Sequence, residues 1–182
     1  MRSNAVLANE RFAEEAAIEV RDKDGHKGVF AKERILADAV VFYLKGAVLT
    51  VPTKYTIELS RHRHLTIRTR RKTGDDLDYC WKYLNHSCEP NGYINTVDRT
   101  FCALRAIACG EELTFNYLTT ESEMAVPFTC NCGSANCFGF IQGRAFLTTE
   151  QADKLAFIMG KDNVVTLFMP VGQSSFGRRK NI

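Results

Sequence analysis

The residues best suited to chemistry are cysteines crowded into one short stretch of the chain. Cys130, Cys132 and Cys137 form a Cys-x-Cys-x4-Cys pattern among asparagine, glycine and serine, and they are three of the seven cysteines in the sequence. Zinc is held by four ligands in a tetrahedron, and cysteine thiolates are well suited to it. Two cysteines two positions apart can face one ion from a tight loop, and Gly133 provides a turn that returns Cys137 to it. The pattern therefore predicts a metal site with three of its ligands in place.

Spacing alone does not decide the fourth ligand. The candidates are the other cysteines and the histidines: Cys80, Cys88, Cys102, Cys109 and the four histidines. Cys88 is the most attractive, because it lies in a loop-like stretch, NHSCEPN, that runs from Asn85 to Asn91. Cys102 and Cys109 lie in or beside a strand pattern and resemble ordinary small core residues. The odd number of cysteines, without a secretion signal, argues against a disulfide framework.

The NHSCEPN stretch is itself a candidate ligand site. Asn85 and His86 stand side by side and offer several hydrogen-bond donors and acceptors to a polar ligand. A loop held together by its own polar side chains explains the same residues equally well, so both interpretations remain open. Asn85-His86-Ser87 also matches an N-glycosylation acceptor, which we interpret as a chance match in a chain without a signal peptide.

Composition excludes several classes of protein. Apolar residues make up 45% of the 182 residues and charged residues 25%, which is typical of a soluble globular chain. No run of eighteen apolar residues occurs, and the charged Met1 to Glu15 stretch lacks an apolar segment, so neither a membrane span nor a secretory signal is expected. We therefore expect an intracellular protein, nuclear in a eukaryote and otherwise cytoplasmic. The net charge of +3 is too weak to imply nucleic-acid binding by itself.

Four motifs follow one another along the chain. They are Lys27-Gly28-Val29-Phe30-Ala31, then Trp81-Lys82-Tyr83-Leu84 leading into NHSCEPN, then ACGEELTFNY ending at Tyr117, and finally the Cys130 to Cys137 cluster. In this order they resemble the N-terminal glycine motif, the two signature motifs and the post-SET zinc motif of the SET-domain protein lysine methyltransferases. Each motif is weak by itself, but the ordered set, which covers about residues 18–145, is highly specific.

The resemblance implies a mostly β SET-domain fold with a post-SET zinc segment and a short C-terminal helix. Its small β-sheets would be joined by a pseudoknot, in which the second signature threads under a preceding loop. The expected divisions are an N-terminal extension at 1–17, a SET domain at 18–126, a post-SET segment at 127–147, and a helix with a basic tail at 148–182. His26 stands where the family has its first glycine, unless Gly25 takes that place with a one-residue shift. Asn116 replaces the usual aspartate, and no cysteine-rich pre-SET segment precedes residue 18.

The resemblance also implies a reaction, the transfer of a methyl group from S-adenosylmethionine to a lysine side chain. Tyr117 would be catalytic, and Tyr43 and Phe115 would line the lysine channel. Phe115 lacks the hydroxyl of tyrosine, which favours di- or trimethylation. The cofactor would be held by Lys27, Gly28, Phe30, Asn85, His86 and Phe140, although the choice between Phe138 and Phe140 as cover for the adenine is open. One structural zinc would be bound by Cys88, Cys130, Cys132 and Cys137.

The substrate is less well defined. A histone is the favoured substrate, and a non-histone protein is the alternative. Two further interpretations are not enzymes: a degenerate module that binds peptide or cofactor without turnover, and a purely structural zinc protein. The basic segment from Arg61 to Lys72 lies where the family places an insert beside the peptide groove. One interpretation is a solvated hairpin face. The other is a lining of the peptide groove, which would favour acidic residues flanking the target lysine, or nucleic acid beside the target. No membrane contact is expected.

Short strands must position these residues. Alternating apolar and polar residues predict strands at 18–21, 28–31, 40–51 with a break at Gly46, 100–107 and 113–117, and a hairpin of 55–59 and 65–69 joined by 60–64. A short helical turn is predicted at 78–84. Thr148 and Gln151 match a capping box, and helical spacing up to Met159 predicts a helix that ends at Gly160. A frayed helix at 3–17 and a strand or packed arm at 164–169 complete the prediction.

Overall fold

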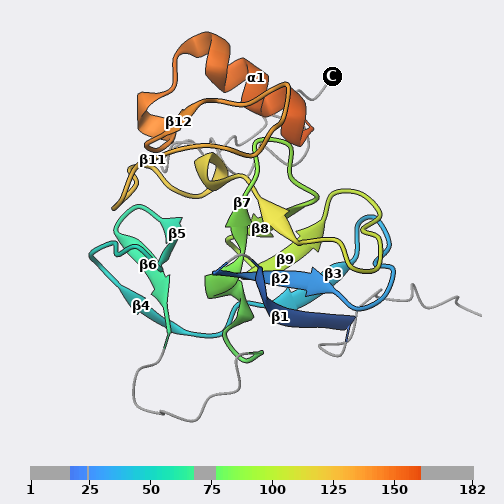
Figure 1. Ribbon diagram of the computed structural model, residues 1–182. Helices are drawn as coiled ribbons and strands as arrows, with labels where there is room; N and C mark the ends of the chain where they lie inside the picture. The colour runs from blue at the N-terminus through green and yellow to red at the C-terminus, as the bar shows by residue number, and fades with distance from the viewer. Residues whose placement is uncertain (1–16, 24, 68–76, 161–182) are drawn as a thin grey trace, which may run out of the picture.

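The computed structural model describes residues 17–23, 25–67 and 77–160. Four sequence-based expectations therefore lie mainly outside the described residues. They are the frayed helix at 3–17, the end of the basic segment at 68–72, the strand or arm at 164–169 and the basic C-terminal tail. Within the described part, short strands predominate and one short α-helix lies near the C-terminal end, so the prediction of a mostly β fold is confirmed (Figure 1).

The strands are two to six residues long. The first six are β1 (Ile18–Lys23), β2 (His26–Ala31), β3 (Val40–Tyr43), β4 (Ala47–Leu49), β5 (Ile57–Ser60) and β6 (Arg63–Thr66). The other six are β7 (Asn85–His86), β8 (Gly92–Asn95), β9 (Thr100–Ala103), β10 (Thr114–Phe115), β11 (Phe128–Thr129) and β12 (Phe140–Ile141). The helical elements are the 3-10 turns η2 (Cys80–Tyr83), η3 (Tyr117–Thr119) and η4 (Arg144–Phe146), and the helix α1 (Thr149–Met159).

These strands form several small sheets rather than one large one (Figure 1). Two sheets have three strands, in the orders β3-β9-β8 and β4-β6-β5, and three are pairs: β1-β2, β10-β7 and β11-β12. Only the β10-β7 pair is parallel; the other described pairings are antiparallel. A parallel pair requires a crossover connection, so β7 and β10 are brought together by the chain between them and not by a hairpin.

The segment from Gly110 to Phe115 lies between two parts of the chain that are distant in sequence. On one side, the backbone N–H of Leu113 donates to the carbonyl of Val29 in β2 at 2.7 Å. On the other side, β10 pairs with β7, and the side chain of Asn91 accepts a hydrogen bond from the N–H of Thr114 at 2.9 Å. Contacts on both sides are expected of a threaded segment, and they bring the NHSCEPN stretch against the second signature.

Two buried clusters hold the molecule together. In the larger one, between the sheets, Phe42 and Phe101 stack with ring centroids 5.3 Å apart, and Trp81 donates from its indole nitrogen to the carbonyl of Lys45 at 2.9 Å. The smaller cluster lies beneath α1 and contains Cys88, Leu118, Cys130, Ile141, Leu155 and Met159. Full burial of an aliphatic side chain such as Leu155 contributes about 1.5–3 kcal/mol, so the smaller cluster fixes α1 and the cysteine-rich segment to the strands.

The helix α1 forms as its sequence predicts. Thr148 accepts from the N–H of Gln151 at 3.2 Å, and the Gln151 side chain accepts from the N–H of Thr148 at 3.0 Å, which completes the capping box. Leu155 and Met159, four residues apart, face the smaller cluster. Gly160, with φ of 76°, ends the helix in a conformation that other residues rarely adopt.

Several predicted strand boundaries were wrong; the strand predicted at 100–107, for example, ends at Ala103, and two further differences have a clear local cause. The hairpin of β5 and β6 turns at Arg61 and His62, not over five residues, because His62 takes a left-handed conformation with φ of 59° and allows a two-residue turn. The strand predicted at 113–117 ends at Phe115. The side chain of Asn116 accepts from the N–H of Leu118 at 3.1 Å and caps η3, so Tyr117 begins a 3-10 turn.

Candidate functional site

Tyr117 lies where two hollows of different size meet. One is a roomy cleft of about 510 Å³, lined by Gly25, His26, Lys27, Asn85, Phe128 and their neighbours. The other is a narrow pocket of about 60 Å³, lined by Ile57, Trp81, Phe115, Glu121 and their neighbours. Both are lined by Tyr117 and Leu84. A volume of several hundred Å³ is typical of a small-molecule site, whereas the narrow pocket suits a slender side chain.

The side chain of Tyr117 is held in a single orientation. Its hydroxyl donates to the carbonyl of Leu84 at 2.8 Å, and its backbone N–H donates to Nδ1 of His86 at 3.1 Å. Burial, together with the nearby carboxylates of Glu121 and Glu112, raises the pKa of Tyr117. The phenol therefore stays protonated at neutral pH and can act as a hydrogen-bonding group, but not as a base.

Of the two predicted channel residues, the structure brings only Phe115 to Tyr117. The Phe115 ring is buried, lines the narrow pocket, and lies with its centroid 4.8 Å from that of Tyr117. Tyr43 ends β3 opposite Thr100 and is 51% exposed, and it lines neither the cleft nor the narrow pocket. The prediction that Tyr43 lines the channel therefore has no support from the geometry, because β3 pairs with β9 and not with the strands around the pocket.

Glu112 organises the predicted cofactor residues around the cleft. Its Oε1 accepts a hydrogen bond from Nδ2 of Asn85 at 2.7 Å, and the same Nδ2 donates to the carbonyl of Lys27 at 3.2 Å. Gly28 leaves room for this carboxylate, because a Cβ at that position would lie 2.7 Å from Oε1 of Glu112. Lys27 and Asn85 line the cleft, whereas Gly28 and the buried Phe30 support it from β2.

His86 links the cleft to the cysteines. Besides accepting from the N–H of Tyr117, it places Nε2 3.3 Å from the sulfur of Cys88. Burial lowers the pKa of His86 to about 4, so its ring is neutral. Both nitrogens are engaged by the protein, and His86 therefore positions the cleft rather than exchanging protons there.

The aromatic residues after the last cysteine do not line the cleft. Phe140 in β12 is 54% exposed, and Phe138 packs in the smaller cluster with the Lys154 ammonium 5.0 Å from its ring centroid. Phe128 in β11 lines the cleft instead, with its ring centroid 5.6 Å from that of His86. Phe128 was not among the predicted cofactor residues, although its place two residues before the first cysteine of the cluster is a usable signal.

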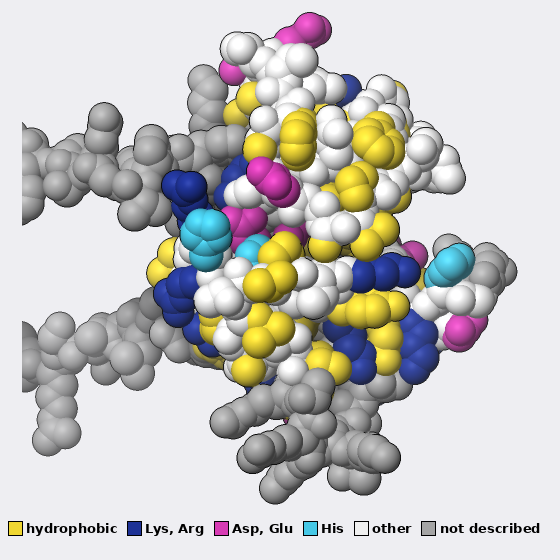
Figure 2. Space-filling model, turned by 90° about the vertical axis from the view of Figure 1, so that its left-hand side faces the viewer, with side chains coloured by type: hydrophobic (Ala, Val, Ile, Leu, Met, Phe, Trp, Pro, Cys, Tyr) yellow, Lys and Arg dark blue, Asp and Glu magenta, His cyan; other side chains and the backbone are white. Residues whose placement is uncertain are grey.

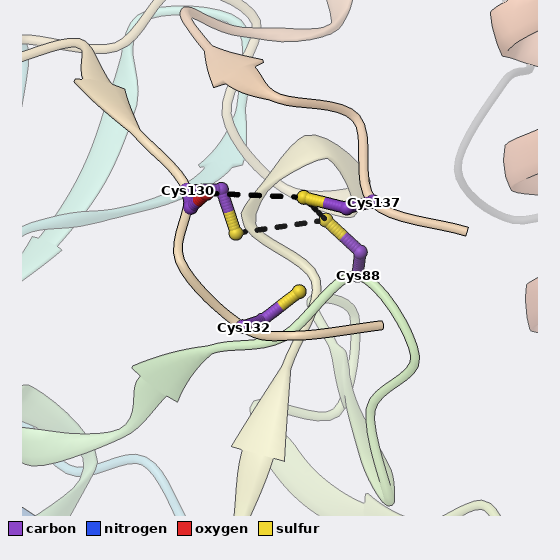
Figure 3. Close-up of side chains that lie close together, drawn as sticks. All are labelled: Cys88, Cys130, Cys132 and Cys137. Carbon is purple, nitrogen blue, oxygen red and sulfur yellow. Dashed lines mark hydrogen bonds between the residues drawn. The ribbon is translucent and has the colours of Figure 1, made fainter. Parts of the chain in front are cut away.

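The four predicted zinc ligands converge on one point (Figure 3). The sulfur of Cys88 lies 3.8 Å from that of Cys130 and 3.9 Å from that of Cys137. The four sulfurs, including that of Cys132, all lie within 4.8 Å of one another. Four thiolates around one zinc at about 2.3 Å stand roughly 3.8 Å apart, so the arrangement fits a tetrahedral ion.

The surroundings of the four thiols differ. Burial raises the pKa of Cys88 and raises that of Cys130 to about 11. Burial also acts on Cys132, but hydrogen bonds from the backbone of Cys88 and Ser134 outweigh it and lower its pKa to about 7. A divalent cation would favour the thiolate form of all four, so binding of a metal here would be coupled to the folding of this segment.

Only the start of the predicted basic segment is described. Arg61, His62 and Arg63 are exposed, whereas His64 is buried with Nδ1 lacking a partner among the described residues. Arg61, His62 and His64 line a hollow of about 400 Å³ together with Glu58 and other polar residues. On the face drawn in Figure 2, acidic and histidine side chains meet in such a hollow with basic side chains at its edge. The lining is therefore mixed in charge, not uniformly basic.

A model of the "SET domain" family matches residues 26–118 of this chain. The H3 lysine-36 specific histone-lysine N-methyltransferase of Chaetomium globosum is 35% identical over 133 residues, which cover 65% of this chain and 14% of that protein. Methyltransferase flvH of Aspergillus flavus is 44% identical over 70 residues, 37% of each chain. The chain thus spans much less than two thirds of the length of these curated relatives.

Solved structures support the fold. The structure of KRYPTONITE in complex with mCHH DNA, an H3(1-15) peptide and SAH superposes with a TM-score of 0.52 and 23% sequence identity, covering 68% of this chain and 29% of that one. At this identity the likeness concerns the fold alone. No helix in the described residues is long and apolar enough to cross a membrane.

Proposed function

Because this chain belongs to the SET-domain family, whose model matches residues 26–118, we propose that it is a protein-lysine N-methyltransferase that uses S-adenosylmethionine. The observation that carries the proposal is the meeting of the roomy cleft and the narrow pocket at Tyr117. The cleft has the volume of a cofactor site, and the pocket has a small volume that suits a slender side chain. A methyl group held at the bottom of the cleft would face an amine held at the end of the pocket.

The methyl transfer requires the protein mainly to position the two reactants and to desolvate the lysine amine. A free lysine has a pKa of about 10.4, so its deprotonation at pH 7 costs about 4.6 kcal/mol before the transfer. The pocket walls of Ile57, Trp81 and Phe115 are apolar, and such surroundings disfavour the ammonium. Alignment of the amine with the methyl donor supplies a larger share of the rate. The fixed hydroxyl of Tyr117 is placed to orient the amine.

The cleft offers groups that fit the methyl donor. Lys27 lines it and can pair with the carboxylate of the amino-acid end, and Asn85 lines it beside the backbone of Lys27. Phe128 offers an aromatic face for the adenine, and this replaces our expectation that Phe140 covers it. The solved relatives bound to SAH are consistent with a cofactor of this kind.

The cysteine cluster fits one structural zinc. Cys88 comes from the loop that follows β7, and the other three ligands come from the segment between β11 and β12 (Figure 3). The ion would supply no step of the reaction. It would fix the cysteine-rich segment, and with it Phe128, against the cleft.

A histone is the substrate class we favour, because several curated relatives are named as histone methyltransferases specific for H3 lysine 36. A nuclear location follows from the same proposal. We retain 18–126 as the proposed SET domain and 127–147 as the proposed post-SET segment, flanked by an extension at 1–17 and by a helix and basic tail at 148–182.

The proposal is tested by methyl transfer from labelled S-adenosylmethionine onto recombinant histones, nucleosomes and a whole-cell protein extract, with mass spectrometry of the products. Methyl-lysine should form with the parent chain and fall strongly with Tyr117→Phe. Tight cofactor binding by calorimetry without transfer to any of these substrates would instead identify a module without turnover. Absence of both cofactor binding and transfer would reject the proposal.

A further inference from the structure

Among the residues that the structure describes, Glu121 is the one carboxylate that lines the cleft or the narrow pocket. It lies in the narrow pocket, four residues after Tyr117, and is 7% exposed. Its Oε1 accepts hydrogen bonds from the N–H of Glu58 at 2.9 Å and from the hydroxyl of Thr120 at 3.0 Å. Among the described residues, no hydrogen bond reaches Oε2. One oxygen therefore fixes the carboxylate, and the other is left as a free acceptor.

The hydroxyl of Tyr117 and both ring nitrogens of His86 are already engaged with the protein. The hydroxyl proton of Tyr117 is committed to the carbonyl of Leu84, and the high pKa of this phenol keeps it protonated. His86 uses Nδ1 to accept from the backbone and turns Nε2 toward Cys88. Lys54 and Lys82 also line the narrow pocket. Among the described residues that line the narrow pocket, Glu121 is the only one with a carboxylate or an imidazole, because His26 lines only the cleft.

The charged groups around Glu121 come from several elements. Tyr117 faces it from η3, Glu58 from β5 and Arg144 from η4, while Lys54 and Lys82 share the pocket lining. Burial raises the pKa of Glu121 to about 7, and the repulsion of Glu58 adds to this, against hydrogen bonds and the attraction of Arg144. A proton acceptor is most effective when its pKa lies near the working pH.

We propose that Glu121 binds the ammonium of the target lysine through Oε2 and accepts its proton inside the pocket. This role rests on the proposed function. An N–H bond of the ammonium breaks and an O–H bond forms on Oε2. The amine keeps the electron pair, which forms the new N–C bond while the C–S bond of the methyl donor breaks. The carboxylic acid then returns the proton to solvent before the next transfer.

Burial lowers the free-energy cost of such a transfer in this location. Free lysine and free glutamate differ by about six pKa units. Desolvation in a buried pocket lowers the pKa of a lysine and raises the pKa of a glutamate. The difference between the two pKa values therefore becomes smaller. The ionised carboxylate also attracts the substrate ammonium, which Lys54 and Lys82 would otherwise repel.

Glu121→Gln is the informative variant, because glutamine keeps the acceptor at Oε1 and nearly the same volume. Initial rates of methyl transfer onto recombinant histones should be measured from pH 6 to 10 for the parent, for Glu121→Gln and for Glu33→Gln. Glu33 is an exposed glutamate that lines neither the cleft nor the narrow pocket, and its variant should match the parent.

The pH profile distinguishes a proton acceptor from a structural residue. The parent rate should rise up to about pH 7 and then level off, because the carboxylate is ionised above that point. At pH 7 the glutamine variant should be about 10²-fold slower, a typical loss for a missing general base. Its rate should go on rising toward pH 10 as solvent deprotonates the lysine, so the gap should close. Equal rates, or a loss that is constant with pH, would overturn the proposal.

Stability provides a readout without turnover. A glutamate whose pKa is raised on folding stabilises the folded state fully below about pH 4.3, and this contribution is lost as pH rises through about 7. Glutamine does not ionise. The melting temperature of Glu121→Gln relative to the parent should therefore increase between pH 6 and 8.5, whereas a difference independent of pH would contradict the buried carboxylate.

The two proposals fail in different ways. A parent that transfers methyl groups with a profile unaffected by Glu121→Gln rejects the role of Glu121 and leaves the proposed function intact. A parent that transfers no methyl group to histones, nucleosomes or extract rejects the proposed function, and the catalytic role of Glu121 with it.

Discussion

The Nδ1 atom of His86 accepts a hydrogen bond from the backbone N–H of Tyr117 at 3.1 Å. His86 and Tyr117 lie 31 residues apart in the sequence, one in each signature motif. Their contact therefore joins the two motifs at the residue on which the proposed chemistry depends. His86 is in turn tied to Cys88, so the cleft, the narrow pocket and the cysteine cluster share one continuous set of contacts. We therefore expect a structural change in the cleft, the narrow pocket or the cysteine cluster to alter the positions of residues in the other two.

Replacement of Tyr117 by phenylalanine removes one hydroxyl and almost no volume. The variant loses the hydrogen bond to the carbonyl of Leu84 but keeps the ring contacts with His86 and Phe115. We expect cofactor affinity and melting temperature to stay near those of the parent, while turnover falls by about 10²-fold or more. Steady-state rates and calorimetric titration with S-adenosylmethionine test this, and turnover equal to that of the parent would mean that Tyr117 is not catalytic.

Replacement of Cys132 by serine should release the metal. Purified parent protein should contain about one equivalent of zinc, and Cys132→Ser should contain far less and melt at a lower temperature, since metal binding and folding are coupled here. Cys102→Ser is the matched control, because Cys102 lies in β9 beside Thr100 and outside the cluster. Metal analysis by mass spectrometry measures both. Protein purified without chelator that contains almost no zinc would contradict the assignment.

Replacement of Phe115 by tyrosine should shift the products toward monomethyl-lysine. The added hydroxyl would enter the narrow pocket next to Tyr117 and occupy the room that an already methylated nitrogen needs to turn. The first transfer needs less room and should lose only a little rate. Mass spectra of one peptide over time, with both proteins, give the ratio of products. If Phe115 is only a core residue, a buried unpaired hydroxyl costs about 1–3 kcal/mol and slows every step alike.

Replacement of Gly28 by alanine should weaken cofactor binding without unfolding the chain. The new Cβ would lie 2.7 Å from Oε1 of Glu112, which must move away and give up its hydrogen bond with Asn85. We expect about a tenfold loss of affinity, equivalent to about 1.4 kcal/mol and comparable to one hydrogen bond. Calorimetry measures the affinity, with Ala31→Gly in the same strand as a control for changes in β2 itself. Unchanged affinity would show that the Glu112–Asn85 contact does not shape the cleft.

The sequence by itself determined the elements whose signals are local. The helix α1 could be predicted because Thr148 and Gln151 cap it, Leu155 and Met159 repeat at helical spacing, and Gly160 ends it. The compact cysteine pattern predicted a metal cluster, and the ordered motifs predicted which fourth cysteine would join it. These features depend on residues close together in the chain or on a pattern of motifs, so one sequence suffices for them.

Tertiary structure alone decided which distant side chains share a pocket. Tyr43 was expected to line the lysine channel, but it ends β3, which pairs with β9, and it lines neither the cleft nor the narrow pocket. Phe128 carries only its place before the cysteine cluster as a sequence signal, and Glu121 carries none. Packing between elements places Phe128 on the cleft and Glu121 in the narrow pocket. The reason is physical. Local propensity fixes the direction of a side chain on its own element, whereas burial and pairing between elements fix what that side chain meets.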